Sequence, residues 1–202
     1  MARECRDASE MAQQRSIIRF ATDAEDVASG LHTFRERLPR NATRITAIIG
    51  ELFALSSILR EIDNAEGDTR FLLSFYQVQD DLNLLFPTLQ RTLAAVFEMF
   101  SRAGERSYQV IWDDLGDRME RDDGGMGLLE RLELYHGFLK AQAHILQGRR
   151  PQRLNDLRRE LVALRDAQEV SVLRLQRLSL DTSGQPDHLP RTTRRLHSRL
   201  NL

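Results

Sequence analysis

The run from Asp117 to His136 (DRMERDDGGMGLLERLELYH) holds the residue types best suited to metal chemistry. Glu133 and His136 are three positions apart, so they project from the same side of a helix. Di-iron bundles use such Glu-x-x-His pairs, but they need two of them and two further glutamates. No other histidine here has a glutamate three positions before it. We therefore predict no metal, with Glu133 in solvent and His136 at the border of the core.

The acidic, glycine-rich loop DDGGMG within this run could be taken for a calcium loop. An EF-hand needs oxygen ligands at positions 1, 3 and 5, glycine at 6 and glutamate at 12. With Gly125 at position 6, position 12 is Arg131, and with Gly124 at position 6, position 1 is Met119. Both registers fail. We interpret the aspartates as turn residues and the glycines as positions that permit positive φ.

Other sequence motifs of catalysis are missing. The chain has no GxxxxGK[ST] phosphate loop, GxGxxG, HExxH or GxSxG. Its one cysteine, Cys5, lies in a polar stretch and excludes a disulfide within the chain. We predict a non-enzymatic protein without a cofactor, since no motif supports either.

Helices must position all of these residues, because apolar side chains recur at steps of three and four. The first two stripes are Ile17, Phe20, Ala24, Val27, Leu31, Phe34 and Leu38, then Ile45, Ile48, Leu52, Leu55, Leu59 and Ile62. Pro39 separates them, and the turn residues of NAEGD follow the second stripe.

A third stripe runs from Phe71 to Phe100 and contains Pro87, which removes a helical hydrogen bond. We therefore expect this helix to be kinked or split. Shorter stripes follow from Tyr108 to Met119, from Leu128 to Ile145, and after Pro151. Together they predict an all-α fold, an antiparallel bundle of about six helices with coiled-coil-like spacing.

Composition divides the chain into three parts. Residues 1–15 form a polar leader that we expect to be frayed, residues 16–180 the bundle domain, and residues 181–202 a disordered basic tail. The leader lacks the apolar core of a secretion signal, and no uncharged apolar run approaches a membrane span of roughly 18 residues. These features favour the cytoplasm.

Charge is unevenly distributed. Residues 1–148 carry 17 Lys+Arg against 24 Asp+Glu, and residues 149–202 carry 12 against 6. Acidic residues alternate with the arginines of the last helix, and no aromatic residue follows position 148, so nucleic acid is an improbable ligand. The candidate basic interaction surface consists of Arg149, Arg150, Arg153, Arg158, Arg159, Arg194 and Arg195.

Three segments resemble a family of all-helical proteins from filamentous fungi: Glu51 to Asp63, Ser107 to Leu115, and Gly127 to Leu139. In that family a Trp-containing helix leads through a glycine-bearing acidic loop to an RLxxYxxFL helix. The resemblance covers roughly Phe34 to Ala167. More remotely, the chain is similar to helical N-terminal domains of fungal NLR-like (STAND) receptors, including HeLo-like membrane-active bundles. It departs from these in lacking their apolar N-terminal segment and a nucleotide-binding domain.

These matching residues also have a structural interpretation. Tyrosine and tryptophan bury a large apolar area and need a partner for their polar tip. We predict that one corner of the bundle is formed by Trp112, Leu132, Tyr135, Phe138 and Leu139.

The function predicted from sequence is a protein-interaction or scaffold module, with an unknown protein partner or a second copy of the chain. The alternative is a HeLo-like bundle that binds anionic lipid through its basic C-terminal region, which is peripheral membrane contact. The two differ in whether the chain binds anionic liposomes at low salt.

Overall fold

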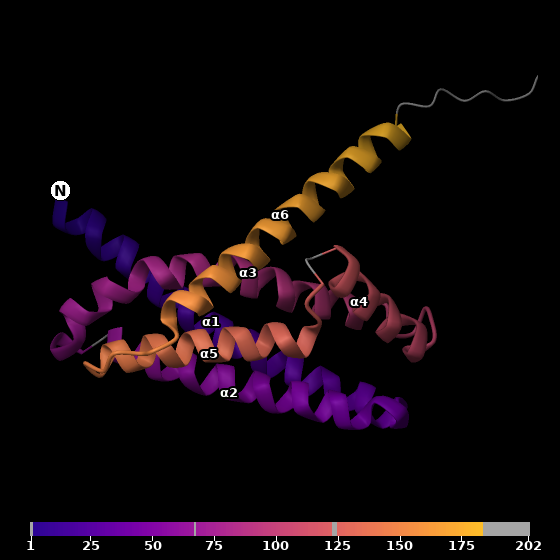
Figure 1. Cartoon of the computed structure of the whole chain (residues 1–202), viewed down its shortest axis with the longest axis horizontal. Helices are drawn as coiled ribbons and strands as arrows, with labels where there is room; N and C mark the ends of the chain where they lie inside the picture. The colour runs from indigo at the N-terminus through magenta and orange to yellow at the C-terminus, as the bar shows by residue number, and fades with distance from the viewer. Residues whose placement is uncertain (1, 67, 123–124, 184–202) are drawn as a thin grey trace, which may run out of the picture.

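Most of the described chain is helical. The computed structural model describes the backbone over residues 2–66, 68–122 and 125–183, and the side chains over 17–66, 68–121 and 125–173. Within these residues there is no strand, which confirms the predicted all-α bundle of six helices (Figure 1). The helices are α1 (Ala2–Arg37), α2 (Ala42–Glu66), α3 (Leu72–Ser101), α4 (Tyr108–Asp122), α5 (Leu128–Leu146) and α6 (Leu154–Ser183), with short 3-10 helices η1 (Pro39–Asn41) and η2 (Thr69–Phe71).

The helix ends follow local chemistry. Pro39 opens η1 directly after Leu38, so the first long helix stops where the sequence predicted. Gly148, with φ of 74°, follows the end of α5 and lets the chain reverse. Its N–H donates to the carbonyl of Ile145, and the N–H of Arg149 donates to that of His144. This glycine-based cap leaves the next residues as an exposed loop leading to α6.

The predicted apolar stripes form one continuous core with contributions from all six helices. Every residue of the first two stripes is buried. Pro87 lies inside an unbroken α3, so of the two alternatives predicted there a split is wrong. Leu85, Phe86 and Leu89 around it are buried. Their packing holds the helix together across the missing hydrogen bond.

Helices that follow one another in the chain run antiparallel around the core, but two pairs that are distant in sequence run parallel. Side-chain hydrogen bonds join Glu51 to His136 and Glu61 to Gln147, so α2 and α5 keep almost the same offset along their length. The hydrogen bonds of Asp81 with Arg158 and of Thr92 with Gln168 likewise give α3 and α6 an almost constant offset. As a result the α2–α3 turn and the α5–α6 loop lie at the same end of the bundle (Figure 1).

The predicted limits of leader, domain and tail stay predictions. The backbone is helical from Ala2, so residues 2–15 belong to the helix α1. That stretch contains alanine, arginine, glutamate and glutamine and has no glycine or proline, a composition that favours a helix. At the other end α6 continues to Ser183. The remainder of the predicted disordered tail, 184–202, lies outside the described residues.

One segment, Pro39–Glu66, is long and apolar enough to cross a membrane by length and composition. Seven of its apolar side chains are buried in the bundle: Ile45, Ile48, Ile49, Leu52, Leu55, Leu59 and Ile62. Its apolarity is therefore accounted for by the core, which it shares chiefly with α1 and α5.

Candidate functional site

The Glu133 and His136 positions were correctly predicted. Glu133 is exposed on α5, and His136 is half-buried. The imidazole pairs with a different carboxylate: Nδ1 of His136 lies 2.7 Å from Oε2 of Glu51 on α2. Nowhere in the described part of the chain do three or more His, Cys, Asp or Glu side chains gather as metal ligands would. The pair of Glu51 and His136 joins α2 to α5.

The acidic loop is a turn between α4 and α5. Asp122 is the last residue of α4, and residues 123–124 lie outside the described chain. Gly125 has φ of 80°, the positive value predicted for the glycines. The Glu130 carboxylate accepts a hydrogen bond of 3.0 Å from the N–H of Gly127, and so satisfies a free donor at the start of α5.

Arg131 is a fully buried cation that the sequence analysis missed as part of the core. Its side chain is 0% exposed. Nε donates to the carbonyl of Met126 at 2.8 Å, and Nη2 donates to that of Met119 at 2.7 Å. It therefore ties the last turn of α4 to the loop and to α5. Spacing was the available signal, because Arg131 lies three residues after Leu128 and four before Tyr135, on the apolar stripe.

The five predicted corner residues are all buried in the core: Trp112, Leu132, Tyr135, Phe138 and Leu139. Four of them belong to α5, which packs against α2, α3 and α6. Trp112 belongs to α4, whose main contacts are with α3 and α6 and not with α5. The five residues thus share one core. They do not form a corner made mainly by α4 packing on α5.

Tyr135 belongs to a buried hydrogen-bond network. Its hydroxyl lies 2.8 Å from the Thr92 hydroxyl and donates to the Thr88 carbonyl at 3.2 Å. Gln168 of α6 donates to the Thr92 hydroxyl at 3.4 Å. Burial raises the pKa of Tyr135 above its usual value near 10, outweighing these hydrogen bonds. The phenol stays neutral and links α3, α5 and α6.

We expect Tyr135→Phe to flatten the loss of stability at alkaline pH. Above about pH 10 the unfolded chain ionises this tyrosine while the folded chain keeps its proton, so stability falls with rising pH by up to about 1.4 kcal/mol per unit. The variant has no phenol to ionise, so its stability should fall less with rising pH. It also loses about 1 kcal/mol of stability at neutral pH through its missing hydrogen bonds. Urea unfolding between pH 8 and 11 measures the free energy of unfolding at each pH, and an equal dependence on pH in the two proteins would contradict the assignment.

A second buried polar cluster joins α3, α5 and α6. Asp81 on α3 is buried, and its two carboxylate oxygens accept hydrogen bonds of 2.7 Å each from Nε and Nη2 of Arg158. Gln142 on α5 donates to the same carboxylate at 2.9 Å. The hydrogen bonds to Asp81 raise the pKa of Arg158, which stays charged. We call these three residues the Asp81 cluster.

Two of the arginines predicted for the basic surface make ion pairs. Arg158 belongs to the Asp81 cluster and Arg159 pairs with Asp156, so neither offers an unpaired charge. Asp156 lies within one helical turn of Arg159, whereas Asp81 contacts Arg158 from α3. Arg194 and Arg195 lie outside the described residues. Of the seven arginines predicted for this surface, those that are exposed and make no ion pair within the described residues are Arg149, Arg150 and Arg153.

A further polar cluster joins α1 to α2. The Glu25 carboxylate accepts hydrogen bonds from the Ser56 hydroxyl and from Nε and Nη2 of Arg60. These bonds hold the pKa of Glu25 below its usual value. The arrangement fixes two helices at the surface.

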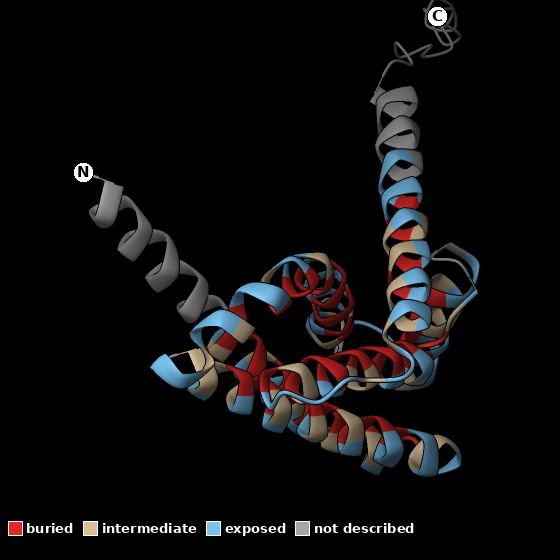
Figure 2. Ribbon diagram, turned by 60° about the vertical axis from the view of Figure 1, so that its left-hand side comes forward, coloured by how far each residue is buried: buried red, intermediate tan, exposed pale blue. Residues whose placement is uncertain are grey.

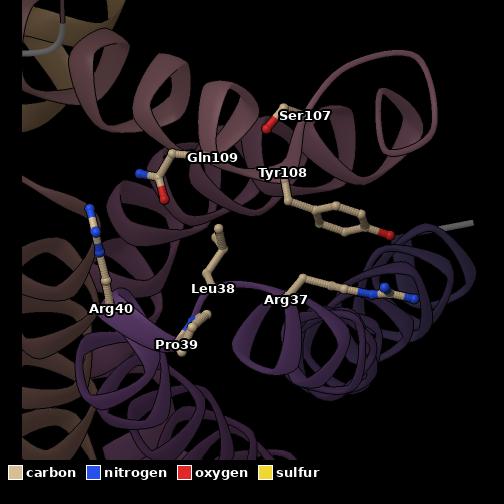
Figure 3. A pocket seen from close by; sticks show the side chains of 7 residues that line it. All are labelled: Arg37, Leu38, Pro39, Arg40, Ser107, Tyr108 and Gln109. Carbon is tan, nitrogen blue, oxygen red and sulfur yellow. The ribbon is translucent and has the colours of Figure 1, made fainter.

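A surface pocket of about 430 Å³ lies where the α1–α2 turn meets the start of α4 (Figure 3). Leu38, Pro39 and Tyr108 are among its lining residues. Arg37 and Arg40 also line it, but their side chains point in different directions and their guanidinium groups lie far apart in the view, so they do not converge on one ligand (Figure 3). The pocket is open and holds no set of convergent polar groups.

Comparison with protein-family models, with curated proteins and with solved structures returned no match for this chain. The resemblance to helical proteins of filamentous fungi, and to NLR-like N-terminal domains, therefore stays a prediction. Function has to be argued from the surface of this bundle.

Proposed function

We propose that the chain is a non-enzymatic helical interaction module that acts in the cytoplasm by binding a second copy of itself. One observation carries the proposal: three large apolar side chains are exposed together at the start of α3. Leu72, Leu73 and Tyr76 are 49%, 80% and 51% exposed. Their spacing places them within one turn of the same helix. We call them the α3 patch.

The surroundings of the α3 patch favour self-association. The α5–α6 loop, with exposed Arg149 and Arg150, lies at the same end of the bundle (Figure 1). The exposed Glu61 is beside that loop, since its carboxylate accepts a hydrogen bond from Gln147. A twofold contact brings each residue of one copy to its counterpart region on the other. An apolar patch at an end of the bundle that also carries both signs of charge suits such a contact.

The α3 patch lies outside the core. Its side chains are about half-exposed or more, whereas Phe75 and Val78 of the same helix are buried. Grouped apolar residues exposed on an otherwise well-packed protein are typical of interaction sites. Substitutions in the patch should therefore change association and leave stability almost unchanged.

We expect Leu73→Asp to abolish self-association. Sedimentation velocity over a range of concentrations and at low and moderate salt measures the effect. Phe53→Asp is the matched control, since Phe53 is a 46% exposed aromatic residue on α2. The proposal predicts that Phe53→Asp associates like the unaltered chain and Leu73→Asp does not. Equal association of the two variants would count against the α3 patch.

The membrane alternative has less support. It relied on the basic C-terminal region, where Arg158 and Arg159 are already paired with carboxylates. The segment Pro39–Glu66, which is long and apolar enough to cross a membrane, has seven of its apolar side chains in the core. We therefore favour a protein partner.

A further inference from the structure

α6 is held to the bundle differently from the other long helices. Of its described side chains four are buried: Leu161, Leu164, Gln168 and Ser171. Two of these are polar, whereas seven of the eight buried residues of α2 are apolar. Figure 2 shows α6 as the tall helix at the right, where exposed residues alternate with a few buried ones. Its attachment therefore depends on polar contacts to an unusual degree.

The polar contacts under α6 come in two layers. The first is the Asp81 cluster, where Arg158 reaches a buried carboxylate. The second is the bond between Gln168 and Thr92, at 3.4 Å. In the described structure Oε1 of Gln142 and Oε1 of Gln168 are buried without a hydrogen-bond partner. Each buried unsatisfied acceptor costs about 1–3 kcal/mol, and these two belong to α5 and α6, so the polar contact of α6 with the bundle is not fully satisfied.

We propose that α6 is a releasable arm covering a helix-binding groove on α3 and α5. The groove suits an amphipathic helix with an arginine for Asp81 and leucines three and six positions later, which is the pattern of Arg158, Leu161 and Leu164. The buried Asp81 carboxylate supplies the specificity, because an unpaired charge there is unfavourable. This site is separate from the α3 patch and does not depend on self-association.

The bundle can lose α6 without losing its main core. The most extensive helix contacts are between α1 and α2 and between α2 and α5, and neither involves α6. The loop before α6 is exposed at Gln147, Gly148, Arg149 and Arg150, so it can serve as the hinge about which α6 moves. Segments with few buried apolar contacts open locally at lower free energy than the whole protein.

Fluorescence anisotropy with a labelled peptide of residues 152–173 tests the groove on the full chain. Arg158→Ala loosens the arm and leaves Asp81 free for the arginine of the peptide. We expect this variant to bind the peptide at least about tenfold more tightly than the unaltered chain. The double variant Arg158→Ala with Asp81→Asn should lose that gain, and so should a peptide in which alanine replaces the arginine.

Two outcomes would overturn the proposal. One is equal binding of the peptide by the Arg158→Ala variant and the unaltered chain. The other is equal binding of peptides with and without the arginine. Hydrogen exchange on the unaltered chain needs no variant: amides of residues 158–171 should exchange at least about tenfold faster than those of residues 45–62. Equal protection of the two segments would show that α6 does not open separately.

Discussion

Replacing Arg131 with alanine is expected to lower the free energy of unfolding by about 3–5 kcal/mol. The guanidinium is fully buried and donates to the carbonyls of Met119 and Met126. Without it each carbonyl is left without that donor, at about 1–3 kcal/mol apiece, and the space of a large side chain is left empty. Urea unfolding followed by circular dichroism gives the free energy directly.

Arg121→Ala is the control for this substitution. Arg121 is exposed and pairs with Asp117 four residues away, and such surface pairs contribute about 0.5 kcal/mol. The two arginines are ten positions apart in the same α4–α5 region. If Arg131→Ala proved as stable as Arg121→Ala, the guanidinium would not hold the end of α4 to α5.

The second large effect is expected for Phe138→Ala, at about 3–5 kcal/mol. Phe138 is fully buried on α5, the helix that contacts α2, α3 and α6. Removing its ring leaves a cavity that three packed helices cannot easily close. The same unfolding measurement applies.

Phe53→Ala provides the comparison, since its ring is 46% exposed on α2 and its loss should cost only about 1 kcal/mol. A similar loss in both variants would mean that burial in the α5 core does not determine the cost.

Apolar periodicity was sufficient to predict the helices and the core. Leu52, Leu55 and Leu59 are spaced for one helix face, and that face is buried. Pro39 and the glycine turns set the limits, because their backbone preferences act locally. The corner residues on α5 followed from the same rule.

Contacts between distant helices could not be predicted in this way. Asp81, Gln142 and Arg158 look like ordinary polar residues, and their cluster exists because α3, α5 and α6 meet. Parallel packing of α2 with α5 likewise depends on how the whole chain turns, which local spacing does not encode. The α3 patch was missed for the opposite reason, since exposed leucines and core leucines look alike in sequence.

Self-association is the central claim, and sedimentation equilibrium of the unaltered chain tests it most directly. The claim predicts that the mean mass rises with concentration from 23.3 kDa toward twice that value, because the α3 patches of two copies cover each other. A mass that stays at 23.3 kDa at every concentration and at both low and moderate salt would contradict it.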